Sequence, residues 1–342
     1  MVLESSAILS SAILKGHYII IFISSIFFSA AGAWFISKYG YHLDMLDRPK
    51  RRSSHQTATP RGGGVGILTG FIAVAIALKL PVSFWLPASC LSAISFLSDR
   101  FEILPLYRLL FQFAASIIFL AGIWNGHPFQ SLGYLWVFLL TLFLVGTANY
   151  YNFMDGINGI AGITGVIGFG LLSFYSYSFT ENSNMAILSL CLSLCCLGFL
   201  PFNFPRAKVF MGDVGSILLG FIFAAIVILL SRSVTDFICL SSFLFPFYAD
   251  EITTEFRRLR DGEKIWIPHR KHFYQLLANE YAIPHWKISL GYGIGQLFVG
   301  ISSLYFINSG LLAVLSIFFL YFLIFTLLSG FMRRRLINKQ GS

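Results

Sequence analysis

Long apolar runs recur along the whole chain and limit the folds that it can adopt. Eleven of them, each of about 20 residues, are separated by polar segments. Lipid offers no partner to unpaired backbone groups, so runs of this length predict membrane-spanning helices. We therefore expect an all-α fold, a polytopic membrane bundle of about 11 transmembrane helices. The runs are residues 17–37, 62–80, 82–98, 107–124, 132–150, 159–179, 185–202, 214–231, 234–250, 287–307 and 310–331.

The basic residues fall almost entirely on one side of this topology. Of the 24 lysines and arginines, three (Lys15, Lys79 and Arg232) lie on one side and the other 21 on the opposite side. Because cytoplasmic loops are enriched in basic residues, the N-terminus is expected outside and the C-terminus in the cytoplasm. The net charge of +9 is then mainly a topology signal. One alternative stays open: Lys15 and the apolar stretch up to Ala33 also fit a cleavable signal peptide.

The chain is expected to form one integral-membrane domain over residues 1–342, because no tandem repeat or soluble domain interrupts the apolar runs. The five cysteines all lie in these runs and form no CxxC pair, so they are expected to be small packing residues. Most ionisable residues gather in five segments expected on the cytoplasmic side: 38–61, 98–106, 149–158, 203–213 and 251–286. These segments are the candidates for an active site.

The segment 203–213 is the most informative of the five. It brings Lys208, Phe210 and Asp213 together beside a membrane helix, where charge is costly unless it has a function. A carboxylate is a hard ligand suited to Mg²⁺, and the lysine can neutralise phosphate oxygens. Phe210 can stack on a base or anchor the chain at the membrane interface.

The segment 149–158 carries a second polar stripe. Asn149 and Asn152 are three residues apart and share a helix face, and Asp155 falls on the same stripe before glycines break the helix. Two amides and a carboxylate at a membrane boundary indicate ligand binding. The alternative is helix capping by Asn158 or Asp155.

Two further segments precede apolar runs. Arg52 and His55 lie before the glycine triplet 62–64, whose N–H groups at a helix N-terminus can approach a phosphate. A basic loop that only sets topology is the alternative. Asp99 lies at a helix end beside Arg100, which alone is weak evidence of function.

The last segment, 251–286, contains a compact group of cations. His269, Arg270 and His272 lie in the string HRKHFYQ. The spacing does not match that of a zinc site, so we expect phosphate binding or an ordinary basic loop.

Taken together, these segments resemble the polyprenyl-phosphate N-acetylhexosamine-1-phosphate transferases, glycosyltransferase family 4. The strings SSHQTATPRGGG, NFMDGING, FPRAKVFMGDVGS and HRKHFYQ are most similar to the branch that starts bacterial O-antigen, lipopolysaccharide or related surface glycans. The resemblance covers roughly residues 40–280. It implies transfer of a sugar 1-phosphate from a UDP-N-acetylhexosamine to undecaprenyl or another polyprenyl phosphate, with release of UMP. It also implies a Mg²⁺ or Mn²⁺ cofactor and a multi-pass enzyme of the bacterial inner membrane whose active site faces the cytoplasm. A homodimer stays open.

The resemblance also implies roles for individual residues. Asp213 is the expected metal ligand, with Asn152 and Asp155 beside it, and Phe210 is expected near the uracil. The catalytic candidates are Asp99, Asp155 and Asp213. The substrate-binding candidates are Arg52, His55, Asn149, Asn152, Asn158, Lys208, Phe210, His269, Arg270 and His272.

The chain departs from the family pattern at three places. Ser98 stands where many members have the first aspartate of an Asp-Asp pair, often assigned as the base. Asn158 stands where the family often has aspartate, and HFYQ replaces a histidine-rich HxHH pattern. A transporter of lipid-linked sugars or ions is the rival function. It is disfavoured because transporters usually carry ionisable residues near the bilayer midplane.

Overall fold

The computed structural model describes residues 2–49, 54, 56–101, 103–264, 267 and 269–340, with side chains except at 2–15, 17, 99, 131, 132, 337, 339 and 340. Its helices are α1 (Val2–Tyr39), α2 (Val65–Ala77), α3 (Val82–Phe101), α4 (Pro105–Ile123), α5 (Tyr134–Phe153), α6 (Ile160–Phe179), α7 (Ser183–Asn203), α8 (Asp213–Leu230), α9 (Val234–Ser241), α10 (Phe245–Arg260), α11 (Phe273–Asn279), α12 (His285–Phe306) and α13 (Leu311–Gln340). Three short 3-10 helices also occur: Pro128–Leu132, Ser242–Leu244 and Ile307–Ser309. The antiparallel strands β1 (Leu46–Asp47) and β2 (Thr59–Pro60) form one small ladder.

Among the described residues, eight helices are long and apolar enough to cross a membrane. They are α1 from Tyr18 onward, α4, α5, α6, α7, α8, α12 and α13. Two shorter apolar helices occur at Val65–Ala77 and Val82–Ser98. The all-α membrane fold is therefore confirmed, whereas the count of eleven spans and the sides on which the termini lie stay predictions.

The run 234–250 departs most from the expected single span. It forms α9, a short 3-10 helix and the first part of α10. Pro246 lies in the first turn of α10, where its missing N–H does not interrupt a helical hydrogen bond. From there α10 continues beyond the apolar run as a polar helix and carries two buried carboxylates, Asp250 and Glu251.

Helix α8 lies at the centre of the bundle, with 89% of its residues buried. Helices α3 and α5 both pack against it. The approach of α5 is close, since a Cβ added at Gly220 would lie 2.7 Å from the carbonyl oxygen of Thr147. This packing brings the first residue of α8, Asp213, next to the C-terminal end of α5.

The cysteines support the expected packing role. Cys191, Cys195 and Cys196 are buried on α7, and Cys239 is buried on α9, whereas Cys90 is exposed. Helix α7 packs against α1 and α6.

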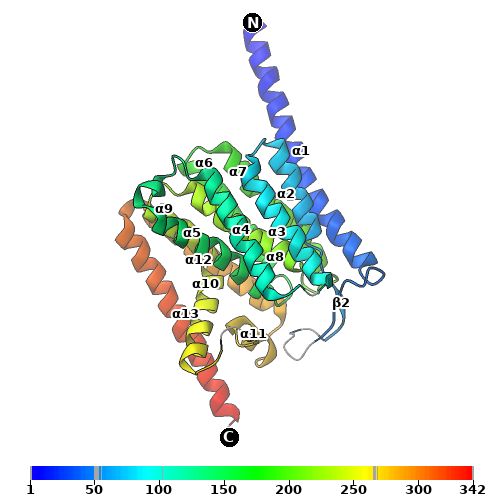
Figure 1. Cartoon of the computed structure of the whole chain (residues 1–342), viewed down its shortest axis with the longest axis vertical. Helices are drawn as coiled ribbons and strands as arrows, with labels where there is room; N and C mark the ends of the chain where they lie inside the picture. Colours follow the sequence, from blue (N-terminus) through cyan, green and yellow to red (C-terminus); the bar gives the residue numbers. More distant parts are fainter. Residues whose placement is uncertain are drawn as a thin grey trace.

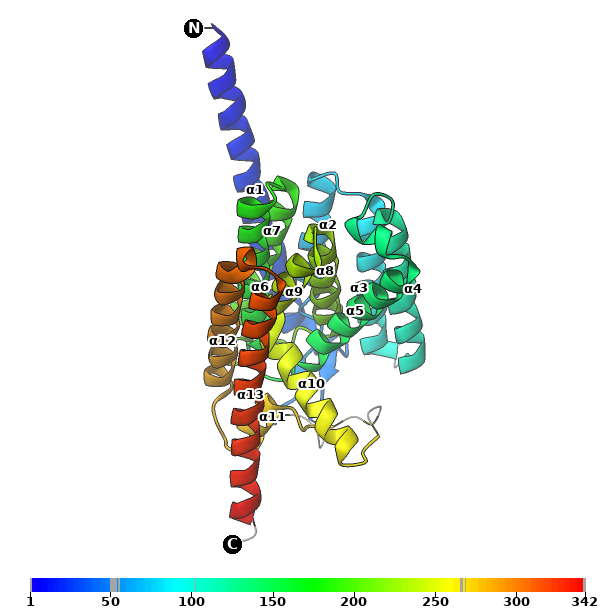
Figure 2. The same cartoon turned by 90° about the vertical axis from the view of Figure 1, so that its left-hand side faces the viewer.

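The polar connections gather at one end of the bundle. Figure 1 shows β2, α11 and the C-terminus at the end opposite to the N-terminus, and Figure 2 shows the same arrangement after a quarter turn. The ends of the five candidate segments therefore meet at one face of the molecule. That this face is cytoplasmic stays a prediction.

Candidate active site

The C-terminal end of α5 supplies two amides that reach two neighbouring helices. Asn149 Nδ2 donates to Gln112 Oε1 of α4 at 2.5 Å. Asn152 Nδ2 lies 2.9 Å from Asp213 Oδ1 and 2.8 Å from Ser216 Oγ, both on α8. The shared orientation of the two asparagines agrees with their spacing in the sequence. The helix ends at Phe153, so Asp155 lies just beyond it and not on a continuing helical stripe.

Asp213 is the first residue of α8 and is held from two sides. Gly212 precedes it with φ of 75°, a backbone conformation that favours glycine and turns the chain into the helix. The carboxylate forms an ion pair with Arg108 of α4 and accepts a hydrogen bond from Asn152. The N-terminus of a helix also favours a negative charge. The carboxylate is therefore fixed where three helices, α4, α5 and α8, come together.

The chemistry of these donors decides which metal they fit. In the part of the chain that the structure describes, no group of three His, Cys, Asp or Glu side chains could hold a metal ion. The start of α8 instead offers one carboxylate, Asp213, beside the side-chain amide of Asn152. Mg²⁺ is commonly bound by one or two carboxylates together with substrate phosphates and water. These residues therefore fit a Mg²⁺ that binds with a diphosphate.

The loop before α8 is anchored by Asn203, which was not predicted from the sequence. Its Oδ1 accepts from the Gly159 N–H at 2.7 Å, and its Nδ2 donates to the Val209 carbonyl at 2.9 Å. Lys208, in this loop, has an exposed side chain, and Phe210 is half-buried. The loop therefore presents a cation and an aromatic ring close to Asp213 in the sequence.

The glycine triplet 62–64 serves packing and not the phosphate contact expected of it. The N–H groups of Gly62 and Gly63 donate to the Phe210 carbonyl at 3.1 and 2.9 Å, and that of Gly64 donates to the Met211 carbonyl at 2.9 Å. A Cβ at Gly64 would lie only 2.5 Å from the Cα of Gly215. These donors are already used, so the phosphate-cradle expectation for them is wrong. The triplet instead lets α2 approach α8 and holds the Asp213 loop in place.

His272 lies in a buried polar cluster beside α10. Its Nε2 is 3.6 Å from Glu251 Oε1, and its Nδ1 is 4.0 Å from Asp250 Oδ1. Burial lowers the pKa of His272 from 6.5 to about 4, and burial raises the pKa of Glu251 well above its usual value. Glu251 Oε1 and His272 Nδ1 are buried without a hydrogen-bond partner among the described residues. Such atoms are costly in a fold and are found at functional sites.

Asp250 positions His272 through the start of α11. It is fully buried and accepts hydrogen bonds from the Phe273 N–H at 2.6 Å and the Tyr274 N–H at 3.1 Å. The hydroxyl of Tyr292 on α12 donates to the same carboxylate at 2.7 Å. One carboxylate therefore caps α11 and ties it to α12.

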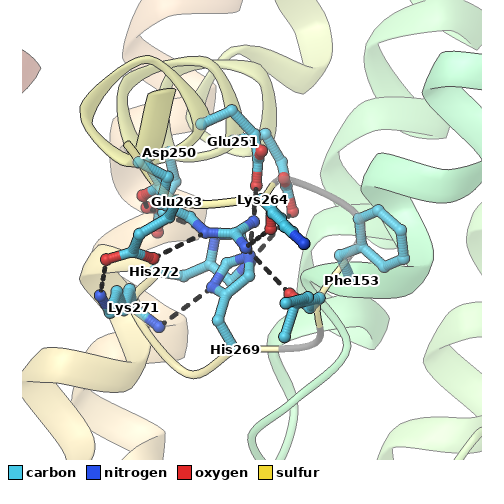
Figure 3. Close-up of polar contacts among 12 residues, drawn as sticks. Phe153, Asp250, Glu251, Glu263, Lys264, His269, Lys271 and His272 are labelled. Carbon is cyan, nitrogen blue, oxygen red and sulfur yellow. Dashed lines mark hydrogen bonds and ion pairs between the residues drawn. The ribbon is translucent and has the colours of Figure 1, made fainter. Parts of the chain in front are cut away.

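The remaining cations of the last segment are paired with carboxylates. His269 Nε2 is 3.2 Å from Glu255 Oε1, Lys271 pairs with Glu263, and Arg270 lies 3.9 Å from Glu280. Burial lowers the pKa of His269, with the charge of Arg258 as a second cause. Figure 3 shows His269, Lys271 and His272 gathered against the acidic side chains of α10 and the loop that follows it. The expected cationic group is thus largely neutralised, and its role in binding substrate stays a prediction.

Arg258 organises this loop. It is 2% exposed and pairs with Glu255 at 2.9 Å and with Glu263 at 3.3 Å. It also donates to the carbonyl oxygens of Lys264 and Ile267. A buried arginine with this many partners ties Glu263, Lys264 and Ile267 to α10.

The end of α5 connects the Asp213 cluster with the His272 cluster. The hydroxyl of Tyr274 donates to the Phe153 carbonyl at 2.9 Å, one residue after Asn152. A Cβ at Gly156 would lie 2.1 Å from this hydroxyl, so glycine is required for the contact. The two clusters therefore flank the same helix end and form one continuous polar face.

Asn158 lies on another side of this helix end. Its N–H contacts His285 Nδ1 at 3.4 Å, and its Nδ2 contacts the Pro205 carbonyl at 3.4 Å. It lines a cavity of about 780 Å³ together with Phe204, Arg206, His285 and Trp286, among others. This cavity is large enough for a small-molecule ligand.

Three predicted site residues cannot be placed in this arrangement. Arg52 and His55 lie outside the described residues, and of Asp99 only the backbone is described, in the last two turns of α3. Their roles stay predictions. Conversely, sequence reasoning missed Arg108, Gln112, Asp250, Glu251 and Arg258 as site residues. The signal available for Arg108 was its position as the single charge at the start of an apolar run.

Comparisons with known proteins show which family the chain belongs to. The family model described as glycosyl transferase family 4 matches residues 81–231. A decaprenyl-phosphate N-acetylglucosaminephosphotransferase of Mycobacterium tuberculosis is 30% identical over 279 residues, covering 69% of each chain. A probable undecaprenyl-phosphate N-acetylglucosaminyl 1-phosphate transferase of Bacillus subtilis is 27% identical, covering 71% of this chain and 72% of its own. An undecaprenyl-phosphate alpha-N-acetylglucosaminyl 1-phosphate transferase of Escherichia coli is 28% identical, covering 75% of each. The chain therefore belongs to glycosyltransferase family 4, the polyprenyl-phosphate N-acetylhexosamine-1-phosphate transferases.

Proposed function

We propose that this membrane protein transfers an N-acetylhexosamine 1-phosphate from a UDP-sugar to a polyprenyl phosphate and releases UMP. One observation carries the proposal. The Asp213 carboxylate is held by Arg108 and Asn152 at the start of a buried helix, where no ordinary packing role accounts for it. The names of the relatives, which act on decaprenyl or undecaprenyl phosphate, support the same reaction.

The chain's own residues have distinct tasks in this reaction. Asp213 and Asn152 would hold a Mg²⁺, which when bound neutralises charge on the diphosphate. Arg108 compensates the Asp213 charge before substrate arrives. Lys208 is exposed and free to contact phosphate oxygens, and Phe210 offers a ring to the uracil. The catalytic contribution is mainly positioning and charge neutralisation, as in other phosphoryl transfers.

The acceptor needs no protein base. A phosphate monoester has a second pKa of about 6, so most of it carries two negative charges at neutral pH. An acceptor oxygen would attack the β-phosphorus in line, forming a new P–O bond as the bond to the UMP oxygen breaks. The buried hydroxyl of Ser98, in place of an aspartate, is compatible with such a step.

A second, more specific proposal concerns the biosynthetic step that this reaction serves. We place the enzyme in the bacterial inner membrane at the first lipid-linked step of an O-antigen or related surface glycan, with the site open to cytoplasmic UDP-sugars. The four motif strings and the concentration of basic residues near this face support that placement.

The test is release of UMP by the purified protein from a panel of UDP-N-acetylhexosamines. We expect release that requires both a polyprenyl phosphate and Mg²⁺, and that favours one sugar of the panel. Movement of a lipid-linked sugar across vesicles without UMP release would instead support the transporter.

A further inference from the structure

An apolar groove of about 510 Å³ lies between α12 and α13, separated from His272 by the Asp250 carboxylate, to which the lining residues Phe273 and Tyr292 donate. Aromatic side chains from four helices form much of its wall: Phe245, Phe273, Phe298, Tyr321 and Phe325. Helix α13 covers one side of the groove. It packs little against the rest of the protein, since only 6% of its most apolar stretch is buried. The groove is therefore open to the hydrocarbon region in which α12 and α13 are expected to lie.

Two glycines of α12 create the floor of the groove. Gly291 and Gly295 both line it, and a Cβ added at either position would meet no atom within 4 Å. They lie one helical turn apart, on the same face. A methyl group at either position would meet only open space, so the two glycines leave room that a ligand can occupy.

One cation lines the groove, and two more lie on helices that border it. Lys287, in the first turn of α12, lines the groove. Arg257 on α10 reaches α13, with Nη2 3.4 Å from the Thr326 carbonyl. Arg333 on α13 donates to the Lys271 carbonyl at 2.6 Å. Among the described residues, none of these three side chains forms an ion pair.

The two arginines lie close enough to repel each other. After burial, the charge of Arg333 is the next cause of a lowered pKa for Arg257, whereas the Asp250 carboxylate raises the pKa of both arginines. The two arginines face this one buried carboxylate, which leaves a positive charge that a further anion between them would stabilise. An apolar groove with such cations at its border is complementary to a lipid with an anionic headgroup.

We propose that this groove binds one anionic glycerophospholipid of the bilayer, with an acyl chain over Gly291 and Gly295 and the headgroup phosphate between Lys287, Arg257 and Arg333. A resident lipid fits better than the acceptor of the reaction. Asp250, Phe273 and Tyr292 form a wall between the groove and His272, joined by the hydrogen bonds of the Asp250 carboxylate. The lipid would also steady α13, whose Arg333 holds the chain next to His272.

The test uses the full-length protein in detergent and counts retained lipids by native mass spectrometry. The probes are phosphatidylglycerol, phosphatidylcholine of the same chain length and a short-chain polyprenyl phosphate. We expect one tightly retained phosphatidylglycerol and much weaker retention of phosphatidylcholine. Replacing two cations, Arg257→Gln with Lys287→Gln, should weaken phosphatidylglycerol binding about thirtyfold.

The groove itself is tested by Gly295→Leu, with Gly291→Leu as a second variant. Each adds a good helix former to a helix and should leave the fold intact. We expect either change to abolish the retained phosphatidylglycerol. The matched control is Ile294→Phe, which adds volume at a 55% exposed position of α12 that does not line the groove.

Three outcomes would overturn the proposal. The first is equal retention of phosphatidylglycerol and phosphatidylcholine by the wild type. The second is unchanged retention in both glycine variants. The third is displacement of phosphatidylglycerol by equimolar polyprenyl phosphate, which would make the groove an acceptor site. None of these outcomes depends on the transferase reaction.

Discussion

Replacing Asp250 by alanine should release α11, and with it His272, from the rest of the protein. The carboxylate is fully buried and accepts hydrogen bonds from two N–H groups of α11 and from the Tyr292 hydroxyl. Helix α11 has only seven residues, too few to be stable without tertiary contacts. The Thr254 hydroxyl donates to it as well, at 3.2 Å, so the substitution would leave four buried donors without this acceptor.

The size of the effect follows from these contacts. A hydrogen bond to a charged group contributes about 1.5–3 kcal/mol, and breaking a buried charged pair costs about 3–5 kcal/mol. Because the four bonds share one acceptor group, their energies do not add, and we take about 3–5 kcal/mol for the whole cap. Every 1.4 kcal/mol corresponds to a factor of ten, so α11 should open about 10² to 4 × 10³ times more often.

Hydrogen–deuterium exchange read by mass spectrometry measures this opening. Peptides that cover residues 269–281 should exchange about 10² to 4 × 10³ times faster in Asp250→Ala, while α8 keeps its protection. The control is Asp261→Ala, which removes an exposed carboxylate at the end of the same helix. Exchange of α11 that changes less than tenfold, with the rest of the fold intact, would show that Asp250 does not hold α11 in place.

Three further substitutions test other parts of the site. Gly64→Ala should lower the free energy of unfolding by about 1–3 kcal/mol, because the added methyl group would clash with α8. Its Tm should be lower than that of the control Gly170→Ala, where a Cβ would approach no atom closer than 3.8 Å. An unchanged Tm with lost activity would indicate that the glycine triplet binds phosphate after all. Because burial lowers the pKa of His272 from 6.5 to about 4, the unfolded chain binds a proton first as pH falls, and stability should drop by up to about 3 kcal/mol between these values. His272→Gln should flatten that part of the pH–stability curve, and an equally steep curve would count against the buried neutral imidazole. Arg108→Gln removes the cation that competes with Mg²⁺ for Asp213. A partly exposed ion pair contributes about 1 kcal/mol, so the Mg²⁺ concentration for half-maximal UMP release should fall roughly fivefold. A higher Mg²⁺ requirement would show that Arg108 helps to bind the diphosphate instead.

The membrane class and the polar motifs could be predicted from the sequence because each depends on local pattern. Apolar runs are read without knowing which helices touch, and Asn149 and Asn152 share a face by helical spacing alone. The family resemblance then pointed to Asp213. These are properties of single segments. The structure confirms the all-α membrane fold and places both asparagines at one end of α5, whereas the role of Asp213 stays a prediction.

Partners from distant segments could not be predicted in this way. Arg108 and Asp213 are 105 residues apart, and Asp250 reaches α11 from 23 residues away. Their pairing depends on how α4, α8, α10 and α11 pack, which no single motif encodes. The prediction that the glycine triplet binds phosphate was wrong for a related reason. The role of the triplet is set by the close approach of Gly215, which lies on another helix.

The broken run 234–250 shows a different limit. Its hydropathy fits one span, but Pro246 allows a new helix to begin there. That new helix turns Asp250 and Glu251 inward against His272. Hydropathy alone cannot distinguish a straight span from two short helices, because both bury apolar side chains.

UMP release by Asp213→Asn is the most direct test of the central claim that the carboxylate at the start of α8 is the reaction centre. The assay uses purified protein, the preferred UDP-sugar, a polyprenyl phosphate and Mg²⁺, with Asp261→Asn as the control for loss of an exposed carboxylate. We expect a fall of at least about a hundredfold for Asp213→Asn, since charge stabilisation worth several kcal/mol is lost, and near-normal release for the control. Near-normal release by a correctly folded Asp213→Asn protein would show that this carboxylate is not the reaction centre.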